Sequence, residues 1–285
     1  MVELSQDRLA AYRRQTFRLI PEIRLRSKEQ AVDYANERGF IFFWPIKGFS
    51  FPSLWTAVTG GSAVPLDHDD PGYITWDWKD DLLDKRVWYY ARILRRRNTI
   101  ISYELLPYFY ALSPNYGEPE EDYLFQYEQG LLSRECKQVY EALIKEGPLD
   151  LISLKRAARL ANPENASRFN RALETLQVEF KVLPVGVAEV GAWNYAFIYD
   201  LTHRYYPHLI AQAGEITEPT ARQKILTTCF RSLGAATERE IGRLFGWRPE
   251  DLKRALAALL ANDILVDQVE LEGSSEPVFA LSDLF

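Results

Sequence analysis

The apolar positions in the second half of the chain repeat in two similar blocks. Each block has three segments with the helical spacing of apolar side chains, followed by two alternating segments around a turn. The first block predicts helices at about 133–146, 151–160 and 162–180 and strands at 181–187 and 193–199. The second predicts helices at about 217–233, 237–246 and 248–262 and strands at 264–271 and 277–281. Three helices closed by a β-hairpin make a winged helix, so we expect two of these in tandem.

The first third of the chain is rich in aromatic residues, and its periodicity predicts shorter elements. The predicted helices cover about 5–20, 27–39, 51–59, 75–92 and 102–112. The apolar run 40–46 predicts a buried connector or short strand, and 99–101 a short strand. The Pro-, Gly- and acid-rich stretch 113–122 predicts an exposed linker and a domain boundary.

These patterns predict a mostly α protein with small β-hairpins, an α+β class of tandem winged-helix (helix-turn-helix) domains. We expect a helical, aromatic-rich and divergent winged-helix region at 1–117. A central winged helix at 123–212 and a C-terminal one at 213–285 should follow it.

Composition narrows the function classes. Of 285 residues, 47% are hydrophobic and 26% charged, which excludes global disorder. The net charge of −6 excludes a generally basic coat, so any contact with DNA must come from local basic patches. Cys136 and Cys229 are too far apart for a disulfide framework or a zinc motif. The chain lacks a signal-peptide pattern and an apolar run that could cross a bilayer, which predicts a cytoplasmic protein without a membrane partner.

One basic cluster lies in a stretch without acidic residues, from Val87 to Tyr103. It consists of Arg92, Arg95, Arg96 and Arg97. Together with the aromatic residues just before it, this cluster suits a phosphate backbone with a stacked base. Alternatively, the basic turn docks on the acidic stretch 118–122 of the same chain.

Further candidate DNA contacts lie on the predicted second and third helices of the two blocks. They are Lys155, Arg156, Arg168, Arg171, Arg248, Lys253 and Arg254. In a DNA-binding winged helix the third helix enters the major groove, and Arg and Lys reach base edges and phosphates. The alternative is an ordinary solvated face, because Glu164, Glu174 and Glu250 are interleaved with them.

Asp77 is the candidate catalytic carboxylate because it lies between Trp76 and Trp78. Burial beside aromatic rings would raise its pKa and suit an acid or a base. The alternative is an acidic residue at a helix start, favoured by the helix dipole. The segment Asp67 to Asp70, with His68, is interpreted as an acidic loop, and His203 and His208 are wrongly spaced to share a metal, so we expect no metal and no cofactor.

The order of several segments resembles the AlkZ/YcaQ family of bacterial DNA glycosylases. The matching pieces are the helix ending at Gly39, Leu54-Trp55, Lys85 to Tyr89, Ser102 to Phe109, Gly147-Pro148-Leu149 and the duplicated wings. Members of that family are tandem winged-helix proteins that excise bulky or crosslinked alkylated bases. The resemblance implies a C-shaped array of winged helices around a groove for double-stranded DNA.

The family's Gln-apolar-Gln or Gln-apolar-Asp motif is replaced here by Phe42-Phe43-Trp44. Aromatic side chains cannot orient the attacking water, so no catalytic residue carries over. We therefore expect a non-catalytic DNA-binding relative, with damaged or distorted DNA as a candidate ligand. Two alternatives stay open: an active glycosylase whose carboxylate has moved, for instance to Asp77, and a winged-helix scaffold for a protein partner, which the acidic charge favours.

Overall fold

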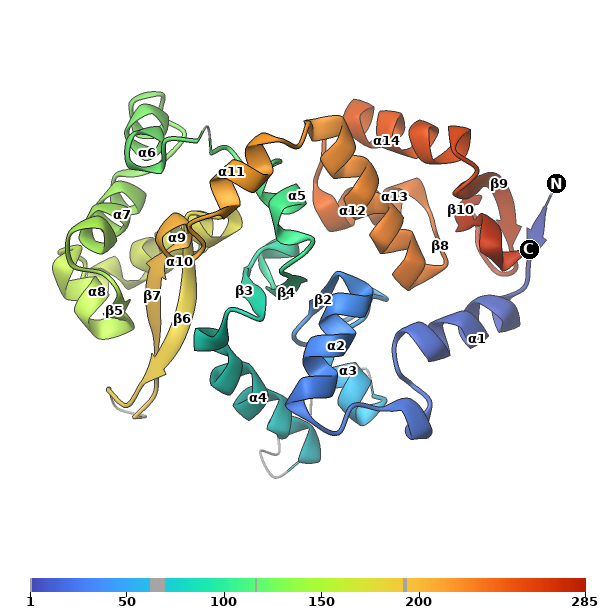
Figure 1. Cartoon of the computed structure of the whole chain (residues 1–285), viewed down its shortest axis with the longest axis horizontal. Coiled ribbons are helices and arrows are strands. Elements are labelled where there is room, and N and C mark those ends of the chain that lie inside the picture. The colour runs from blue at the N-terminus through green and yellow to red at the C-terminus, as the bar shows by residue number, and fades with distance from the viewer. Residues whose placement is uncertain (1, 62–69, 116, 192–193) are drawn as a thin grey trace.

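Three small sheets with one strand order organise the part of the chain that the structure describes. The computed structural model describes residues 2–61, 70–115, 117–191 and 194–285 (Figure 1). The strand orders are β2-β4-β3, β5-β7-β6 and β8-β10-β9, with β1 added beside β9. In each sheet the third strand along the chain lies between the first two. Each sheet is preceded by a helix and interrupted by two more, so the winged-helix order occurs three times.

The N-terminal unit, residues 28–102, carries the first of these sheets. Its elements are α2 (Lys28–Arg38), β2 (Phe40–Phe42), α3 (Leu54–Thr59), α4 (Ile74–Leu82), β3 (Trp88–Arg92) and β4 (Asn98–Ser102). Before it come β1 (Glu3–Leu4) and α1 (Gln6–Thr16), and after it α5 (Leu106–Tyr110) and α6 (Pro119–Glu128). Short 3₁₀ turns lie at Pro21–Ile23, Pro71–Tyr73, Leu83–Lys85 and Leu94–Arg96.

The central unit, residues 134–201, and the C-terminal unit, residues 218–281, follow the same plan. The central elements are α7 (Arg134–Glu146), β5 (Leu149–Asp150), α8 (Leu151–Ala157), α9 (Ala166–Val178), β6 (Val182–Ala188) and β7 (Ala196–Leu201). Two connecting helices are α10 (Thr202–Tyr205) and α11 (Leu209–Gly214). The C-terminal elements are α12 (Glu218–Leu233), β8 (Ala235–Ala236), α13 (Glu238–Phe245), α14 (Pro249–Ala261), β9 (Leu265–Leu271) and β10 (Val278–Leu281). Short 3₁₀ turns lie at Pro163–Asn165 and Ser282–Leu284.

Local sequence signals explain where helices begin and end. Ser5, Ser27, Ser133 and Thr237 cap their helices by accepting hydrogen bonds from backbone amides of the first turn. The predicted capping box at Thr237 is complete. Gly39 ends α2 with φ of 75°, and a side chain there would meet Thr228 at 2.5 Å, so both its conformation and its surroundings require glycine.

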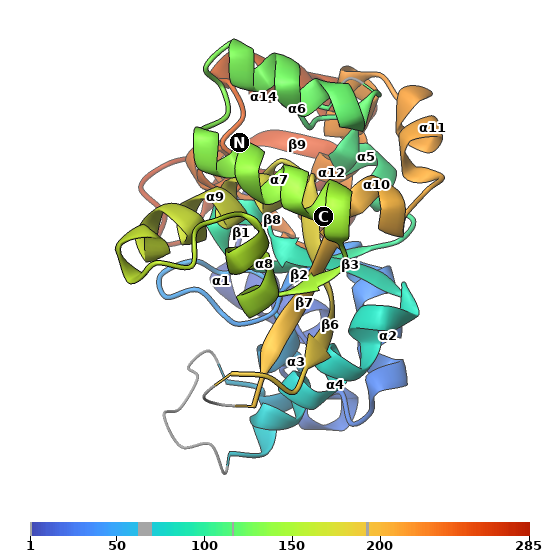
Figure 2. The ribbon, with the colours of Figure 1, turned by 90° about the vertical axis from the view of Figure 1, so that its left-hand side faces the viewer.

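The first and last units share one hydrophobic core. Phe40 of β2 packs against Phe245 at the end of α13, with ring centres 6.0 Å apart, and both belong to the same cluster as Ile225 and Phe230 of α12. The central unit has its own core around Leu143, Phe169 and Leu176, but its Phe180 and Leu183 belong to the shared cluster. Figure 2, turned from the first view, shows the central unit in front of the other two. The first and last units are therefore in direct contact, although the central unit separates them in the sequence.

The structure corrects two predictions for the first half of the chain. Residues 88–92 form strand β3 and not the end of a helix, because Trp88, Tyr89 and Tyr90 are buried and pair with β4. The predicted linker 113–122 runs into a helix, since Glu120 and Glu121 lie in the first turn of α6 and Asp122 is buried. Tyr116 of that stretch lies outside the described residues. The limits of the three predicted domains stay a prediction.

Candidate nucleic-acid interface

The β3–β4 turn presents arginines in an unusual backbone conformation. Arg95 and Arg96 have φ of 53° and 56°, and the Arg97 amide donates to the Leu94 carbonyl oxygen at 2.9 Å. Two central residues with positive φ are characteristic of a type I′ hairpin turn, which favours Asn and Gly. Arginine has a Cβ and is strained there, and such strain persists most often where the side chain is needed.

The segment at the family's motif position is built into the core. The side chains of Phe42 and Phe43 are each 1% exposed and point to opposite faces of the sheet. The Phe42 ring packs on Phe51, and the Phe43 ring on Tyr90. Trp44, just beyond the strand, is half-buried. Neither phenylalanine can reach a substrate, and Trp44 marks the point where this segment comes to the surface.

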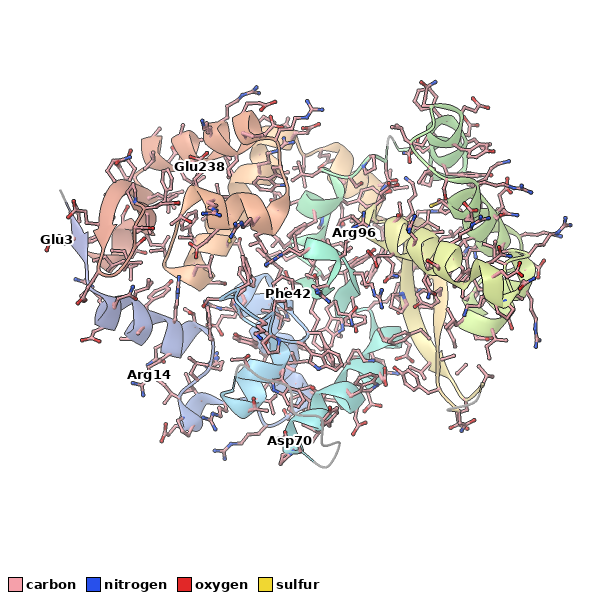
Figure 3. All side chains as sticks on the ribbon, turned by 180° about the vertical axis from the view of Figure 1, so that it is seen from behind. Glu3, Arg14, Phe42, Asp70, Arg96 and Glu238 are labelled. Carbon is pink, nitrogen blue, oxygen red and sulfur yellow. The ribbon has the colours of Figure 1, made fainter. Side chains whose placement is uncertain are left out.

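The basic turn and the motif segment line one groove of about 640 Å³. One side comes from the loop Trp44, Pro45, Ile46 and Lys47, and the other from Arg92, Arg95, Arg96, Arg97, Asn98 and Glu174. Five cationic side chains therefore face a single carboxylate among the described lining residues. Figure 3, seen from behind, shows Arg96 beside α9, where it pairs with Glu174. Four predicted DNA contacts from the β3–β4 hairpin are thus brought together at one site.

The basic turn does not dock on the acidic stretch 118–122, as the alternative interpretation held. Arg92 and Arg96 instead pair with Glu174 of α9, at 3.3 and 2.9 Å. The Arg92 backbone amide also donates to the side-chain oxygen of Gln177 at 3.1 Å. The third helix of the central unit therefore lies against the hairpin of the N-terminal unit.

The predicted contacts of the central unit are divided between two places. Arg171 is exposed on α9, one helical turn before Glu174, and so lies on the helix that borders the groove. Arg168 is also exposed on α9, but its nearest acidic partner is Glu135 of α7 at 4.0 Å. Lys155 and Arg156 lie on α8, where the Lys155 ammonium stacks on Phe169. These last two do not line the groove.

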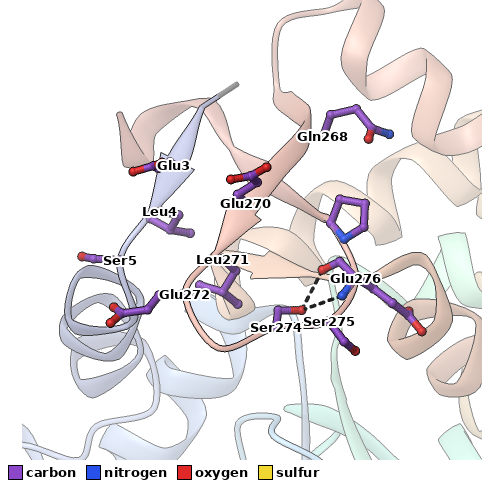
Figure 4. Close-up of a pocket in the computed structure, with 11 residues that line it drawn as sticks. Glu3, Leu4, Ser5, Gln268, Glu270, Leu271, Glu272, Ser274, Ser275 and Glu276 are labelled. Carbon is purple, nitrogen blue, oxygen red and sulfur yellow. Dashed lines mark hydrogen bonds between the residues drawn. The ribbon is translucent and has the colours of Figure 1, made fainter.

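The structure does not bring the predicted contacts of the C-terminal unit to the groove. Arg248, Lys253 and Arg254 are exposed on or next to α14. This helix lies at the top of Figure 1, whereas β3 and β4 lie near the centre. The adjoining wing is acidic, because Glu3, Glu270, Glu272 and Glu276 line a cavity between β1 and β9 (Figure 4).

Sequence reasoning missed residues that a loop and a different helix supply. Lys47 lies soon after the motif segment in the sequence, and this closeness could have identified it as a groove residue. Arg243 of α13 lines a small cavity of about 90 Å³ with Phe49, so the second helix of the C-terminal unit approaches the turn in place of the third. No sequence signal separates Arg243 from the many other helix-borne arginines.

Asp77 is exposed, not enclosed by its aromatic neighbours in sequence. Successive side chains on a helix point about 100° apart, so Trp78 turns inward while Asp77 turns to solvent. Asp77 does line an open cavity of about 680 Å³ with Tyr73 and Trp76. Pro71 and Ile74 also line it, but the carboxylate lacks the burial that the catalytic hypothesis required.

A buried lysine joins the N-terminal and central units. The Lys79 side chain of α4 is 1% exposed, and its Nζ lies 2.6 Å from Asp80 and donates to the Tyr195 hydroxyl at 3.0 Å. The rings of Phe197 and Trp76 have their centres 4.4 and 4.6 Å from this nitrogen. Burial lowers the pKa of Lys79, and Asp80 opposes that shift. The sequence offered no warning, since lysine is rarely fully buried.

Within the described ranges, no group of three or more His, Cys, Asp or Glu side chains is placed to hold a metal ion. Asp67, His68 and Asp69 of the predicted acidic loop lie outside those ranges. No helix in the described part of the chain is long and apolar enough to cross a membrane.

Comparisons with known proteins agree with the winged-helix topology. No curated protein matches the sequence. The structure is similar to that of Streptomyces sahachiroi DNA glycosylase AlkZ, with a TM-score of 0.58 and 13% identity, covering 99% of this chain and 71% of that one. At this identity the likeness shows a shared fold, and the predicted fold class is confirmed. The sequence model of the AlkZ-related family matches residues 25–246, so the resemblance noted in the sequence is also confirmed and the chain belongs to the AlkZ-related family.

Proposed function

We propose that this protein binds double-stranded DNA in the groove between the β3–β4 turn and residues 44–47, without excising a base at the family's motif position. The carrying observation is the convergence of Arg92, Arg95, Arg96 and Arg97 on one cavity with Trp44. Arginines recognise phosphates through paired hydrogen bonds, and an aromatic ring offers a surface for stacking. The similarity to a structure named as a DNA glycosylase supports DNA as the partner.

The charge distribution supports local binding on an acidic protein. With a net charge of −6, the protein as a whole repels DNA, so local basic groups such as those of the groove must supply the attraction. Binding should release condensed counterions from a few phosphates and weaken steeply as salt rises.

The motif segment supports the absence of catalysis. A glycosyl bond breaks with positive charge on the sugar, which a carboxylate or amide normally stabilises. An aromatic face contributes about 0.5–2 kcal/mol to holding a cation, which is at most about 30-fold in rate. Base excision needs about a millionfold or more. Phe42 and Phe43 are buried as well, so only Trp44 could contribute.

A charge-reversal experiment with a matched control tests the binding site. Changing Arg95, Arg96 and Arg97 together to Glu should weaken binding to every duplex about equally, measured by fluorescence anisotropy across a salt series. The control changes Arg248, Lys253 and Arg254 to Glu, which alters net charge by the same amount on α14. If the control loses as much affinity as the turn variant, the groove is not the site. If the unaltered protein does not bind duplex at micromolar concentration in low salt, the proposal fails.

A protein partner is the second candidate function, and one surface favours it. Tyr127 of α6 and Leu131 just after it are 36% and 65% exposed. Figure 1 shows α6 at the top left, beside α7 and away from β3 and β4, so a protein contact there is compatible with DNA in the groove.

A further inference from the structure

Glu174 occupies the position between two groove arginines that a phosphate could take. Its two carboxylate oxygens each accept from a different guanidinium, Arg92 at 3.3 Å and Arg96 at 2.9 Å. A phosphodiester offers the same arrangement, two oxygens sharing a negative charge, and arginine binds both groups in the same way.

We propose that Arg92 and Arg96 form a subsite for one backbone phosphodiester, and that Glu174 competes for it in the DNA-free protein. This inference rests on the proposed binding of DNA and adds a named phosphate position and a built-in competitor.

The exposure of the three side chains makes exchange feasible. Arg92 and Arg96 are 50% and 58% exposed, and Glu174 is 23% exposed. Ion pairs with this much solvent are weak, so an incoming phosphate can displace the carboxylate.

The docking of α9 on the hairpin does not depend on Glu174. Gln177, one turn further along α9, holds the Arg92 backbone amide through its side-chain oxygen and is 5% exposed. Its amide nitrogen donates to the Leu173 carbonyl oxygen at 3.2 Å, which fixes its orientation. Glu174 can therefore turn away by side-chain rotation while the helix stays in place.

Removing the competing charge should strengthen binding. Glu174→Gln keeps the shape of the side chain, and we expect duplex DNA to bind about 3- to 10-fold more tightly at low salt. The salt dependence should also steepen, by up to about 0.9 in the slope of log K against log salt. In the unaltered protein the displaced Glu174 carboxylate takes up a cation, which offsets one cation released from the DNA; in Glu174→Gln this offset is absent.

Glu37→Gln is the matched control. Glu37 of α2 also bridges two arginines, Arg18 and Arg38, through separate oxygens, and it lies outside the groove. Glu37→Gln changes the net charge by the same amount as Glu174→Gln, and it should leave the DNA affinity and its salt dependence unchanged. In a background with Arg92→Gln and Arg96→Gln, the gain from Glu174→Gln should disappear.

The outcomes separate the two proposals. The inference is supported if Glu174→Gln binds duplex more tightly than the unaltered protein, Glu37→Gln does not, and the gain disappears in the background with Arg92→Gln and Arg96→Gln. If the unaltered protein binds duplex and Glu174→Gln binds equally or less tightly, or Glu37→Gln gains as much, the competitor role is overturned while DNA binding stands. If neither the unaltered protein nor Glu174→Gln binds duplex, both proposals are overturned.

Discussion

The guanidinium carbon of Arg95 lies 4.8 Å from the centre of the Phe49 ring. This contact stacks the tip of the β3–β4 hairpin on the loop that follows the motif segment. Phe49 in turn packs against Phe51, which joins the core that Phe42 and Phe40 occupy. The exposed arginines are therefore mounted on a rigid base and not on a free loop.

Replacing Arg95 and Arg96 with residues that favour positive φ should have opposite effects on stability and on DNA binding. We expect Arg95→Asn with Arg96→Gly to raise the free energy of unfolding by about 1–2 kcal/mol, because Asn and Gly accept positive φ more readily. The same variant should lose DNA affinity, as it removes two groove charges. Urea denaturation and anisotropy measure the two effects.

Arg159→Asn is the control for the turn variant. Arg159 is exposed with φ of 58° but lies outside the groove. Its replacement should also stabilise the protein, yet leave DNA affinity unchanged. A turn variant that is more stable and binds DNA as tightly as the original would contradict a functional role for the strained arginines.

Restoring a glutamine of the family motif should harm the fold. Phe42→Gln replaces a ring that is 1% exposed with an amide that has no evident partner, and we expect a loss of about 3 kcal/mol or more in unfolding free energy. Trp44→Gln, at a half-buried position, should cost clearly less. Guanidinium denaturation of the two variants compares them, and equal losses would mean that Phe42 is less tightly packed than described.

The buried lysine should make stability depend on pH. The folded state lowers the pKa of Lys79 below the usual 10.5, so the unfolded chain holds more protons at this site in the interval between the two values. The stability of the protein should therefore rise with pH in that interval relative to Lys79→Met, by at most about 1.4 kcal/mol per pH unit. Measurements should stay below pH 10. Burial raises the pKa of Tyr195, so above the pH at which tyrosines of the unfolded chain ionise, this residue makes the stability fall with pH.

Lys85→Met controls for the loss of a lysine. Lys85 is exposed and pairs with Asp84 at the surface. A stability difference between the unaltered protein and Lys79→Met that stays flat up to pH 10 would argue against a perturbed lysine.

Base release is the decisive test of catalysis. We expect duplex DNA carrying alkylated bases to lose none above the uncatalysed rate, since Phe42-Phe43-Trp44 offers neither carboxylate nor amide. Asp77→Asn should change stability by no more than about 0.5 kcal/mol, as expected at an exposed site. Robust release that Asp77→Asn abolishes would establish the relocated carboxylate instead.

How far the sequence predicted the structure differs between the two halves. The C-terminal elements followed from clear signals, such as the capping box at Thr237 and Gly246 at the end of the same helix. Trp88 to Arg92 were predicted as helix because a run of buried aromatic residues has no distinguishing period, and only pairing with β4 makes it a strand. The pairing partners, from Asn98 for Arg92 to Ser102 for Trp88, are set by the hairpin and not by the periodicity of residues 88–92.

The candidate site was predictable in charge but not in geometry. The acid-free stretch around Arg95 identified the basic turn. The cationic side chains of α14, which also carries Glu250 and Asp251, lie elsewhere because α13 faces the turn. Which helix of the C-terminal unit faces the turn depends on how the units pack on one another, and so does the pairing of Arg96 with Glu174. The burial of Lys79 was likewise invisible, since its partner Tyr195 is supplied by another unit.

The shared core of the first and last units has a consequence for biosynthesis. Phe40 emerges from the ribosome roughly 200 residues before Phe245, against which it packs. At about 5–20 residues per second, translation leaves this aromatic surface without its partner for about 10–40 s. The nascent N-terminal unit therefore exposes part of its aromatic core, to chaperones and to aggregation, until α13 has been made.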